Sequence, residues 1–420
     1  MRIEDLRSET NGDRVRVAAI VIWEDCERAT QEVFYETSQD FAADLTCDPH
    51  AFLIGAILPA IGRGERRIAI DAPICPELRT GVLTALEWLR EWSLLGRSIS
   101  IESRAEARYP YVLQPRAASF LSGGVDSLAI LRANRLDFPL DHPGAFKDCL
   151  FVHGFDIGGL DDTGLELAAY AMALSAASNV AQDAGATLIP VHTNIRHLYD
   201  DVHFWIYQFH GAALASVAHA FSRRLTAVSI ASGFRISNLV KAATHPLIEP
   251  NYGSANLRIR HEGILYSRLD RVRLLSDWQA ALDNLRVCTK NPPGKLNCGM
   301  CEKCLRTMLE LLALGSLERT TAFPYRDVSP EMLANIHLSE PYQDVWYADL
   351  IPPLTAQGRL DLVKAIQEKR DAFRKRLAWK EERDWKGVVK RFDRRWLDGA
   401  LRKTYKTIRN NLLPSTTSRH

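Results

Sequence analysis

The sequence predicts an α/β protein built on a doubly wound parallel sheet, with a small α/β domain before it and a basic helical region after it. Three observations support this fold class. Strand-like and helix-like segments alternate between residues 113 and 235, short apolar strands recur before residue 112, and the chain after residue 353 is helical in pattern and rich in Lys and Arg. Such alternation is typical of parallel sheets with right-handed crossovers. We expect domains at 1–112, 113–320 and 321–420.

The first domain is expected to contain short strands and two helices. Its strand segments are rich in β-branched and aromatic residues, which favour extended structure. The predicted strands cover residues 15–23, 32–35, 67–70 and 98–101, and the predicted helices cover 51–61 and 83–95. No group of residues in this domain has the pattern of a catalytic site, so its role is open.

The second domain supplies the sheet on which a ligand is expected to bind. Its predicted strands are 117–121, 149–152, 187–191 and 227–231, and its predicted helices are 127–133, 164–184 and 204–222. Ligands of such sheets bind beyond the carboxyl ends of the strands. The segments placed there are 122–127, 153–156, 192–194 and 232–234.

The loop after the first of these strands carries the most specific signal. Ser122, Gly123, Gly124, Val, Asp126 and Ser127 join an apolar strand to a helix. Two glycines let the backbone approach a ligand, and the helix start offers unpaired N–H groups and a positive dipole end to a phosphate. The serine hydroxyls add donors, while Asp126 can cap the helix or help to hold Mg²⁺.

Four cysteines near residue 300 predict a metal site. Cys288, Cys298, Cys301 and Cys304 are spaced x9, x2 and x2, whereas the other four cysteines of the chain are scattered. Four thiolates can surround one tetrahedral ion, and they favour Zn²⁺ or an iron–sulfur cluster. Because four protein ligands leave no open position for substrate, the site is interpreted as structural.

The loop resembles the Ser-Gly-Gly-x-Asp-Ser loop of the ATP pyrophosphatases, the PP-loop family. Loop and cysteine knuckle together resemble the QueC-like 7-cyano-7-deazaguanine synthases over roughly residues 115–315. The resemblance implies a nucleotide-binding (HUP-type) sheet, ATP and Mg²⁺ as cofactors and a structural Zn²⁺. It also implies an enzyme that adenylates a carboxylate or carbonyl oxygen, releases pyrophosphate, and lets an amine or ammonia attack. The Tyr-Pro-Asp-Cys-Arg string of that family has no equivalent here, so the substrate is open.

The resemblance also implies roles for individual residues. Asp126 and Ser127 are assigned to the catalytic step. The nucleotide is expected to contact a wider set of residues at the strand ends: Ser122, Gly123, Gly124, Asp126, Ser127, His153, Gly154, Ser232 and Gly233. For His153 a purely structural role is an equal alternative. The residues themselves suggest weaker candidates. Arg235, Lys241, Arg268 and Arg271 are candidates for binding phosphate or a carboxylate, and Arg306 is a candidate for which a place on a helix surface is the commoner case. Asp156, Asp161 and Asp162 are candidates for holding Mg²⁺, with a solvated turn as the commoner explanation.

Charge and hydropathy indicate where the protein is located and which partners it can bind. Residues 359–420 carry 19 Lys and Arg against 8 Asp and Glu, while the rest of the chain carries 34 against 43. The start of the chain lacks an apolar signal segment, and the most apolar stretch, 51–61, is too short to cross a bilayer. A cytoplasmic protein without a membrane partner is expected.

Two alternative functions remain open beside the adenylating enzyme. One is a tRNA-modifying PP-loop enzyme, and the other is a non-catalytic nucleotide-binding subunit of a bacterial antiviral defence complex. In the basic tail, Trp379, Trp385 and Trp396 lie among Lys and Arg, a pattern that suits nucleic acid or a protein partner. An amphipathic helix pair whose Leu362, Val363, Ile366 and Phe373 face the protein core is the simpler interpretation.

Overall fold

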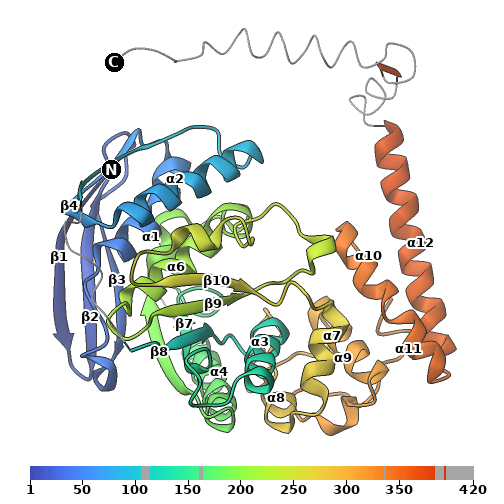
Figure 1. Cartoon of the computed structure of the whole chain (residues 1–420). Coiled ribbons are helices and arrows are strands. Elements are labelled where there is room, and N and C mark those ends of the chain that lie inside the picture. The colour runs from blue at the N-terminus through green and yellow to red at the C-terminus, as the bar shows by residue number, and fades with distance from the viewer. Residues whose placement is uncertain (106–113, 160–163, 335, 384–391, 394–420) are drawn as a thin grey trace. The chain divides into compact units, whose positions relative to one another are not determined.

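A computed structural model describes residues 1–105, 114–159, 164–334, 336–383, 392 and 393 (Figure 1). The chain forms two compact units, Met1–Val328 and Ser329–His420. The first unit contains the sheet, the loop and the cysteine cluster. The predicted residues Asp161, Asp162, Trp385 and Trp396 lie outside the described residues.

One ten-stranded sheet runs through the first unit. Its strands, in spatial order, are β10 (Arg258–Glu262), β9 (Ala227–Ala231), β6 (Ala117–Phe120), β7 (Phe146–His153), β8 (Thr187–Thr193), β3 (Gln31–Ser38), β2 (Arg14–Ile22), β1 (Arg2–Asn11), β4 (Arg67–Ile74) and β5 (Ser100–Ala105). Neighbours are parallel except at β8–β3, β3–β2 and β2–β1. The α/β class and a mostly parallel sheet are therefore confirmed.

Strands from the first two predicted domains share this sheet. Strand β3 pairs with β8 through Tyr35 opposite Thr193 and Glu36 opposite His192. Asn194 adds side-chain bonds across the same junction, because its Oδ1 accepts from the Phe34 N–H and its Nδ2 donates to the Glu32 carbonyl. The antiparallel strands β1 to β3 thus extend the parallel strands directly.

The five parallel strands from β10 to β8 have the topology of a doubly wound sheet. The chain passes from β6 through α3 (Val125–Asp137) to β7, and through α4 (Gly164–Asp183) to β8. It then returns through α5 (Val202–Phe204), the π-helical turn η3 (Trp205–Phe209) and α6 (His210–Ala220) to β9, on the other side of β6. The strand order therefore reverses beside β6, the position at which such sheets bind ligands.

The predicted elements are largely present, with one helix that begins earlier than predicted and two strands that were not predicted. The four predicted strands of the second domain correspond to β6, β7, β8 and β9. The helix predicted at 83–95 is α2 (Pro76–Glu91), which begins earlier because Pro76 occupies its first turn, where a missing N–H is harmless. Strands β1 and β10 were missed because they contain many charged residues.

Helix α1 (Pro49–Arg63) forms the centre of the core. Every residue from His50 to Ile61 is buried, since the helix packs against β4, β1 and α6. Asp48 caps its start by accepting from the His50 N–H, and Gly64 ends it with a φ of 94°. A helix that is apolar on all sides is typical of a buried position. Among the described residues, no helix has the length and apolar composition to cross a membrane.

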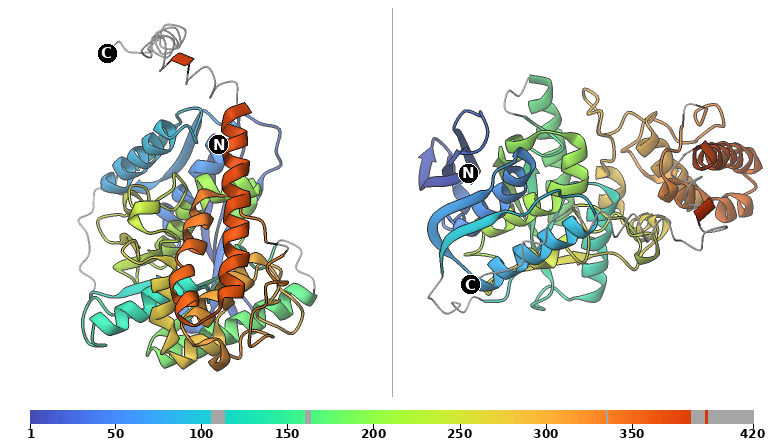
Figure 2. Two further views of the ribbon diagram at one scale, coloured as in Figure 1. Left: turned by 90° about the vertical axis from the view of Figure 1, so that its right-hand side faces the viewer. Right: turned by 90° about the horizontal axis from the view of Figure 1, so that it is seen from above.

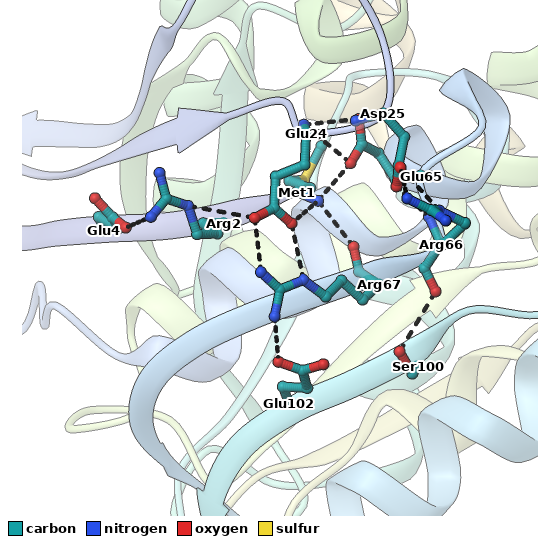
Figure 3. A network of polar contacts seen from close by, with 10 residues as sticks. All are labelled: Met1, Arg2, Glu4, Glu24, Asp25, Glu65, Arg66, Arg67, Ser100 and Glu102. Carbon is teal, nitrogen blue, oxygen red and sulfur yellow. Dashed lines mark hydrogen bonds and ion pairs between the residues drawn. The ribbon is translucent and has the colours of Figure 1, made fainter.

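A polar network joins β1, β4 and β5 on one side of this core (Figure 3). The buried amino group of Met1 donates to Glu24 Oε2 (3.1 Å), to the Arg67 carbonyl (2.9 Å) and to the buried Glu65 carboxylate. Arg67 in turn bridges Glu24 and Glu102. The network thus satisfies the charge of Glu65 inside the protein, where an unpaired carboxylate would be strongly destabilising.

Short helices complete the first unit. They are η1 (Gln39–Phe41), η2 (Ile195–Tyr199), η4 (Ile236–Asn238), η5 (Glu249–Tyr252), α7 (Arg268–Ser276), α8 (Gln279–Asn284), α9 (Glu302–Ala313) and η6 (Leu317–Arg319). A capping box between Ser267 and Asp270 starts α7, which packs against α3, α8 and α9. These helices bring the segment after residue 263 next to the loop.

The described part of the second unit begins with turns and continues with helices from Pro341 on. It contains α10 (Pro341–Ala348), α11 (Ile351–Ala356) and α12 (Leu360–Arg383), and α12 packs against both of the others (Figure 2). The predicted packing face is confirmed: Leu362, Val363, Ile366 and Phe373 are buried. Arg370 and Arg374 pair with Asp344 of α10.

Candidate functional site

The loop between β6 and α3 has the geometry expected of an anion cradle. Gly123 has a φ of 77°, which favours glycine, and Gly124 is the N-cap of α3 with φ −77° and ψ 160°. The first backbone N–H groups of α3 have no partner within the helix, so they and the positive end of its dipole are available to an anion.

The two serine hydroxyls close the loop on itself in this state. Ser122 Oγ accepts from the Gly124 N–H (3.3 Å) and lies 3.2 Å from Ser127 Oγ. Ser127 Oγ donates to the Gly124 carbonyl (3.0 Å). A ligand that used these hydroxyls would exchange internal hydrogen bonds for its own.

Asp126 is held by two arginines of α7. Its Oδ1 accepts from Arg271 Nη1 (3.1 Å) and Arg268 Nη1 (3.3 Å). Although burial opposes ionisation, these guanidinium groups hold the pKa of Asp126 below its ordinary value. The carboxylate is therefore charged at neutral pH and fastens the first turn of α3 to α7.

A second carboxylate lies behind this pair. Arg268 Nε donates to both carboxylate oxygens of Glu310 in α9 (3.2 Å each), and its Nη2 donates to Thr307 Oγ1 (3.2 Å). Arg271 Nη2 donates to the Gly263 carbonyl (3.1 Å). Both arginines, which the sequence suggested as phosphate ligands, are thus engaged by protein acceptors beneath the loop.

Arg286 is a site residue that the sequence interpretation missed. Its backbone N–H donates to the Gly123 carbonyl (2.9 Å), and its side-chain Nη2 donates to Asn291 Oδ1 (2.8 Å). It forms no ion pair within the described part of the chain, and burial lowers its pKa. The Asp156 carboxylate, which lines the same cavity, acts on Arg286 electrostatically without forming an ion pair. A partly buried cation placed in this way against the glycine loop is suited to an anionic ligand.

A cavity of about 70 Å³ lies between the loop and Arg286. It is lined by Ser122, by the ends of β6 and β7, by Asp156, and by His210 and Leu214 of α6. Ligand pockets are typically about 300–1,000 Å³. A nucleotide could therefore enter only if neighbouring groups moved.

A larger cavity of the first unit lies at the opposite edge of the sheet. It measures about 760 Å³ and is lined by residues at the amino ends of β6, β9 and β10, among them Ala117, Ala227 and Arg258. Parallel sheets bind ligands at their carboxyl ends. Because the donors of the loop face that end, we assign the candidate site to the smaller cavity despite its size.

The predicted nucleotide contact His153 is surrounded by other side chains of the protein. His153 lies against the rings of Tyr170 and His192, with centroids 4.6 and 4.7 Å away. Gly158 covers it so closely that an added Cβ would lie 2.1 Å from His153 Nε2. The structure thus favours the packing role that was the alternative for His153.

Of the predicted contacts at the other strand ends, Gly154 and Ser232 have local roles, whereas Gly233 is open. Gly154 has a φ of 98°, and an added Cβ would lie 1.9 Å from the Thr193 carbonyl oxygen, so only glycine fits. Ser232 Oγ donates to the Phe234 carbonyl (2.8 Å) and accepts from its N–H (3.2 Å). Gly233 has open space around its Cα.

The four predicted cysteines converge and could hold a metal such as zinc. The Sγ atoms of Cys298 and Cys304 are 3.8 Å apart, those of Cys288 and Cys301 3.9 Å, and those of Cys301 and Cys304 3.3 Å. Thiolates about 2.3 Å from a tetrahedral ion lie about 3.8 Å from one another, so two of these separations match. Although burial opposes it, N–H groups of Met300 and Cys301 lower the pKa of Cys298 to about 7, which favours the metal-binding thiolate.

A buried asparagine joins the cluster to the chain around it. Asn297 Oδ1 accepts from the N–H groups of Val287 (2.9 Å) and Cys288 (3.1 Å). Its Nδ2 donates to the carbonyls of Leu285 (2.7 Å) and Ala322 (2.9 Å). The side-chain amide of Asn297 thus makes four hydrogen bonds, which join the segment 285–288 to Ala322.

A second group of possible metal ligands, Asp48, His50 and His219, does not fit an ion. His50 Nε2 accepts from the Cys75 N–H (3.0 Å), so the proton of the neutral ring lies on Nδ1, 3.0 Å from Asp48 Oδ1. A ligating histidine instead donates from its other ring nitrogen. The group is an N-cap carboxylate beside a histidine whose Nε2 is already engaged by the backbone.

Comparison of the chain with protein-family models, with curated proteins and with solved structures finds no match.

Proposed function

We propose that this protein is an ATP pyrophosphatase of the PP-loop type that adenylates an oxygen of its substrate. In the reaction a carboxylate or carbonyl oxygen attacks the α-phosphorus of ATP, the adenylyl group is transferred to that oxygen and pyrophosphate leaves; an amine or ammonia then displaces AMP. The observation that carries the proposal is the place of the 122–127 loop. It follows β6, beside which the strand order reverses, and it begins a helix whose first N–H groups are free of helical partners.

The residues around the loop would stabilise the charge that develops on the departing pyrophosphate. Backbone N–H groups of the loop and the Arg286 guanidinium are donors fixed in advance, the usual source of the largest catalytic effect. Arg268 and Arg271 keep Asp126 ionised and paired. These ion pairs hold the first turn of α3 in place while negative charge develops on the pyrophosphate.

The residues present fit the proposed cofactors. Mg²⁺ prefers oxygen ligands. Two carboxylates could supply them: Asp126, of which one oxygen accepts no hydrogen bond from a described residue, and Asp156, which lines the cavity. When bound, Mg²⁺ would neutralise phosphate charge. We assign Zn²⁺ to the cysteine cluster, because a closed set of four thiolates suits a structural zinc.

The substrate class is the most open part of the proposal. The resemblance to QueC-like enzymes makes a carboxylated 7-deazapurine the first compound to test, and a role in antiviral defence is compatible with the additional regions of the chain. We propose a cytoplasmic location on the sequence features alone.

Product analysis tests the proposal directly. The zinc-loaded protein is incubated with Mg-ATP, ammonium and a carboxylated 7-deazapurine, and the nucleotides are separated by ion exchange. AMP and pyrophosphate in equal amounts are expected. Formation of ADP and phosphate would reject the reaction class.

A second candidate is a nucleotide-binding subunit without turnover. The small cavity and the internally bonded serines favour a state that is closed to substrate. Asp126→Ala distinguishes the two candidates: an enzyme loses product formation, whereas a binding subunit keeps its partners and never forms product. The tRNA-modifying alternative depends on the basic tail, most of which lies outside the described residues.

A further inference from the structure

We infer that the cysteine metal site controls nucleotide affinity by holding Arg286 against the glycine loop as a phosphate-binding residue. The inference rests on the proposed function, because it concerns the same loop. It adds a ligand contact that the loop motif does not contain, and it gives the metal a measurable effect on anion binding.

The segment that precedes Cys288 lies directly on the loop. The Arg286 N–H donates to the Gly123 carbonyl (2.9 Å), and the Cβ that alanine would add at Gly123 would lie 3.5 Å from Arg286 Cβ. Beside Gly124, the equivalent position is 3.8 Å from the Arg286 carbonyl oxygen. Any displacement of residue 286 therefore changes the surroundings of both glycines.

The same segment is part of the metal knuckle. Cys288 follows Arg286 by two residues, and its N–H is held by Asn297, the neighbour of Cys298. The Arg286 side chain bonds to Asn291, which lies between the first two cysteines and has a φ of 43°. Both the backbone and the guanidinium of Arg286 are thus positioned by the knuckle.

Charge pairing singles out Arg286 among the arginines near the loop. Arg268 and Arg271 pair with Asp126, and Arg306 pairs with Glu302. Arg286 has only the neutral Asn291 as a side-chain acceptor among the described residues. Asp156, which lines the same cavity, acts on Arg286 electrostatically but forms no ion pair with it among the described residues. An incoming phosphate would therefore find a guanidinium that no salt bridge occupies, in a partly desolvated position where charge-assisted bonds are strong.

Linkage makes the coupling reciprocal. If metal binding orders Arg286 and thereby strengthens anion binding, anion binding must strengthen metal binding by the same factor. The metal would therefore be released more slowly when the loop is occupied.

The test measures the binding of Mg-pyrophosphate and Mg-ATP by isothermal titration calorimetry in the full chain. Proteins to compare are the wild type, Arg286→Gln, and Lys290→Gln as a matched control that removes an exposed charge from the same knuckle. Loss of a charge-assisted bond predicts roughly 10- to 100-fold weaker binding for Arg286→Gln and wild-type binding for Lys290→Gln. In the zinc-free wild type we expect a similar loss, and zinc removal from Arg286→Gln should add little.

The rate of zinc release is a second readout, separate from nucleotide affinity. The rate at which zinc passes to a chelator is followed with and without pyrophosphate; pyrophosphate should slow it in the wild type and not in Arg286→Gln. Asn291→Ala keeps all four cysteines, so it tests the contact with Arg286 even if the wild type unfolds without zinc. We expect this variant to bind pyrophosphate more weakly than the wild type. Two results would overturn the inference alone. One is an anion affinity of Arg286→Gln equal to that of the wild type, and the other is a rate of zinc release from the wild type that pyrophosphate does not change. A wild type that binds neither anion overturns the proposed function as well.

Discussion

Alanine substitutions at Gly123 and Gly124 separate the two roles of glycine in the loop. Gly123 has a φ of 77°, and its added Cβ would make only ordinary contact, 3.5 Å from Arg286 Cβ. The penalty at Gly123 is therefore backbone strain, about 1–2 kcal/mol. Gly124 has a φ of −77°, a conformation open to any residue, and its Cβ would lie 3.3 Å from Ser122 Oγ. Its substitution should change stability by less than about 0.5 kcal/mol.

These penalties convert into melting temperatures through the size of the first unit. Unfolding entropy is about 2.1 cal/mol/K per residue. For the unit Met1–Val328, a loss of about 1–2 kcal/mol lowers the Tm by roughly 1.5–3 °C. Gly123→Ala should show this decrease, whereas Gly124→Ala should melt within about 1 °C of the wild type.

For Mg-ATP binding we expect a large effect at Gly124, where the effect on stability is small. A methyl group at Gly124 stands where the backbone must approach a phosphate, so we expect Gly124→Ala to bind Mg-ATP at least about 10-fold more weakly at nearly unchanged stability. Thermal unfolding by circular dichroism and titration calorimetry measure the two effects on the same samples. If Gly124→Ala binds Mg-ATP as the wild type does, the loop is not the phosphate site.

Two further predictions concern the metal and the buried histidines. Cys298→Ser should lose the bound metal and melt at a lower temperature, while Cys26→Ser, outside the cluster, should keep the metal. The metal content of both variants is measured by mass spectrometry. Full metal occupancy in Cys298→Ser would show that the cluster is not the metal site. Burial lowers the pKa of His219 to about 4, so between pH 6.5 and 4 the unfolded chain binds a proton that the folded protein excludes. Stability should therefore fall as the pH falls through this range, by up to about 1.4 kcal/mol per pH unit for one such histidine. Urea unfolding at several pH values should give a smaller dependence in His219→Gln, whose amide can still donate to the Tyr252 carbonyl; an equal dependence would contradict the assignment.

The features that the sequence predicted depend on short stretches of chain. Strand and helix alternation located β6 to β9, and the spacing of four cysteines located a cluster whose Sγ atoms do converge. The loop was recognisable because six consecutive residues carry its chemistry. In each case the residues that matter are close in sequence, and local periodicity or spacing is enough to find them.

The features that were missed depend on pairing between distant segments. Asp126 and Arg268 are 142 residues apart, and nothing local in α7 indicates that its arginines bind the loop. Arg286 follows an ordinary short helix, and only the fold brings its N–H to the Gly123 carbonyl. The division into three domains and the roles given to His153 and Ser232 stay predictions, although the contacts of both side chains favour local packing.

The measurement that tests the central claim most directly is the identity of the bond broken in ATP. Phosphorus-31 NMR of a reaction with Mg-ATP, ammonium and a carboxylated substrate resolves pyrophosphate from phosphate and AMP from ADP. Cleavage between the α and β phosphates, which yields AMP and pyrophosphate and is abolished by Asp126→Ala, is the predicted result. Accumulation of ADP and phosphate by the wild type would contradict the account.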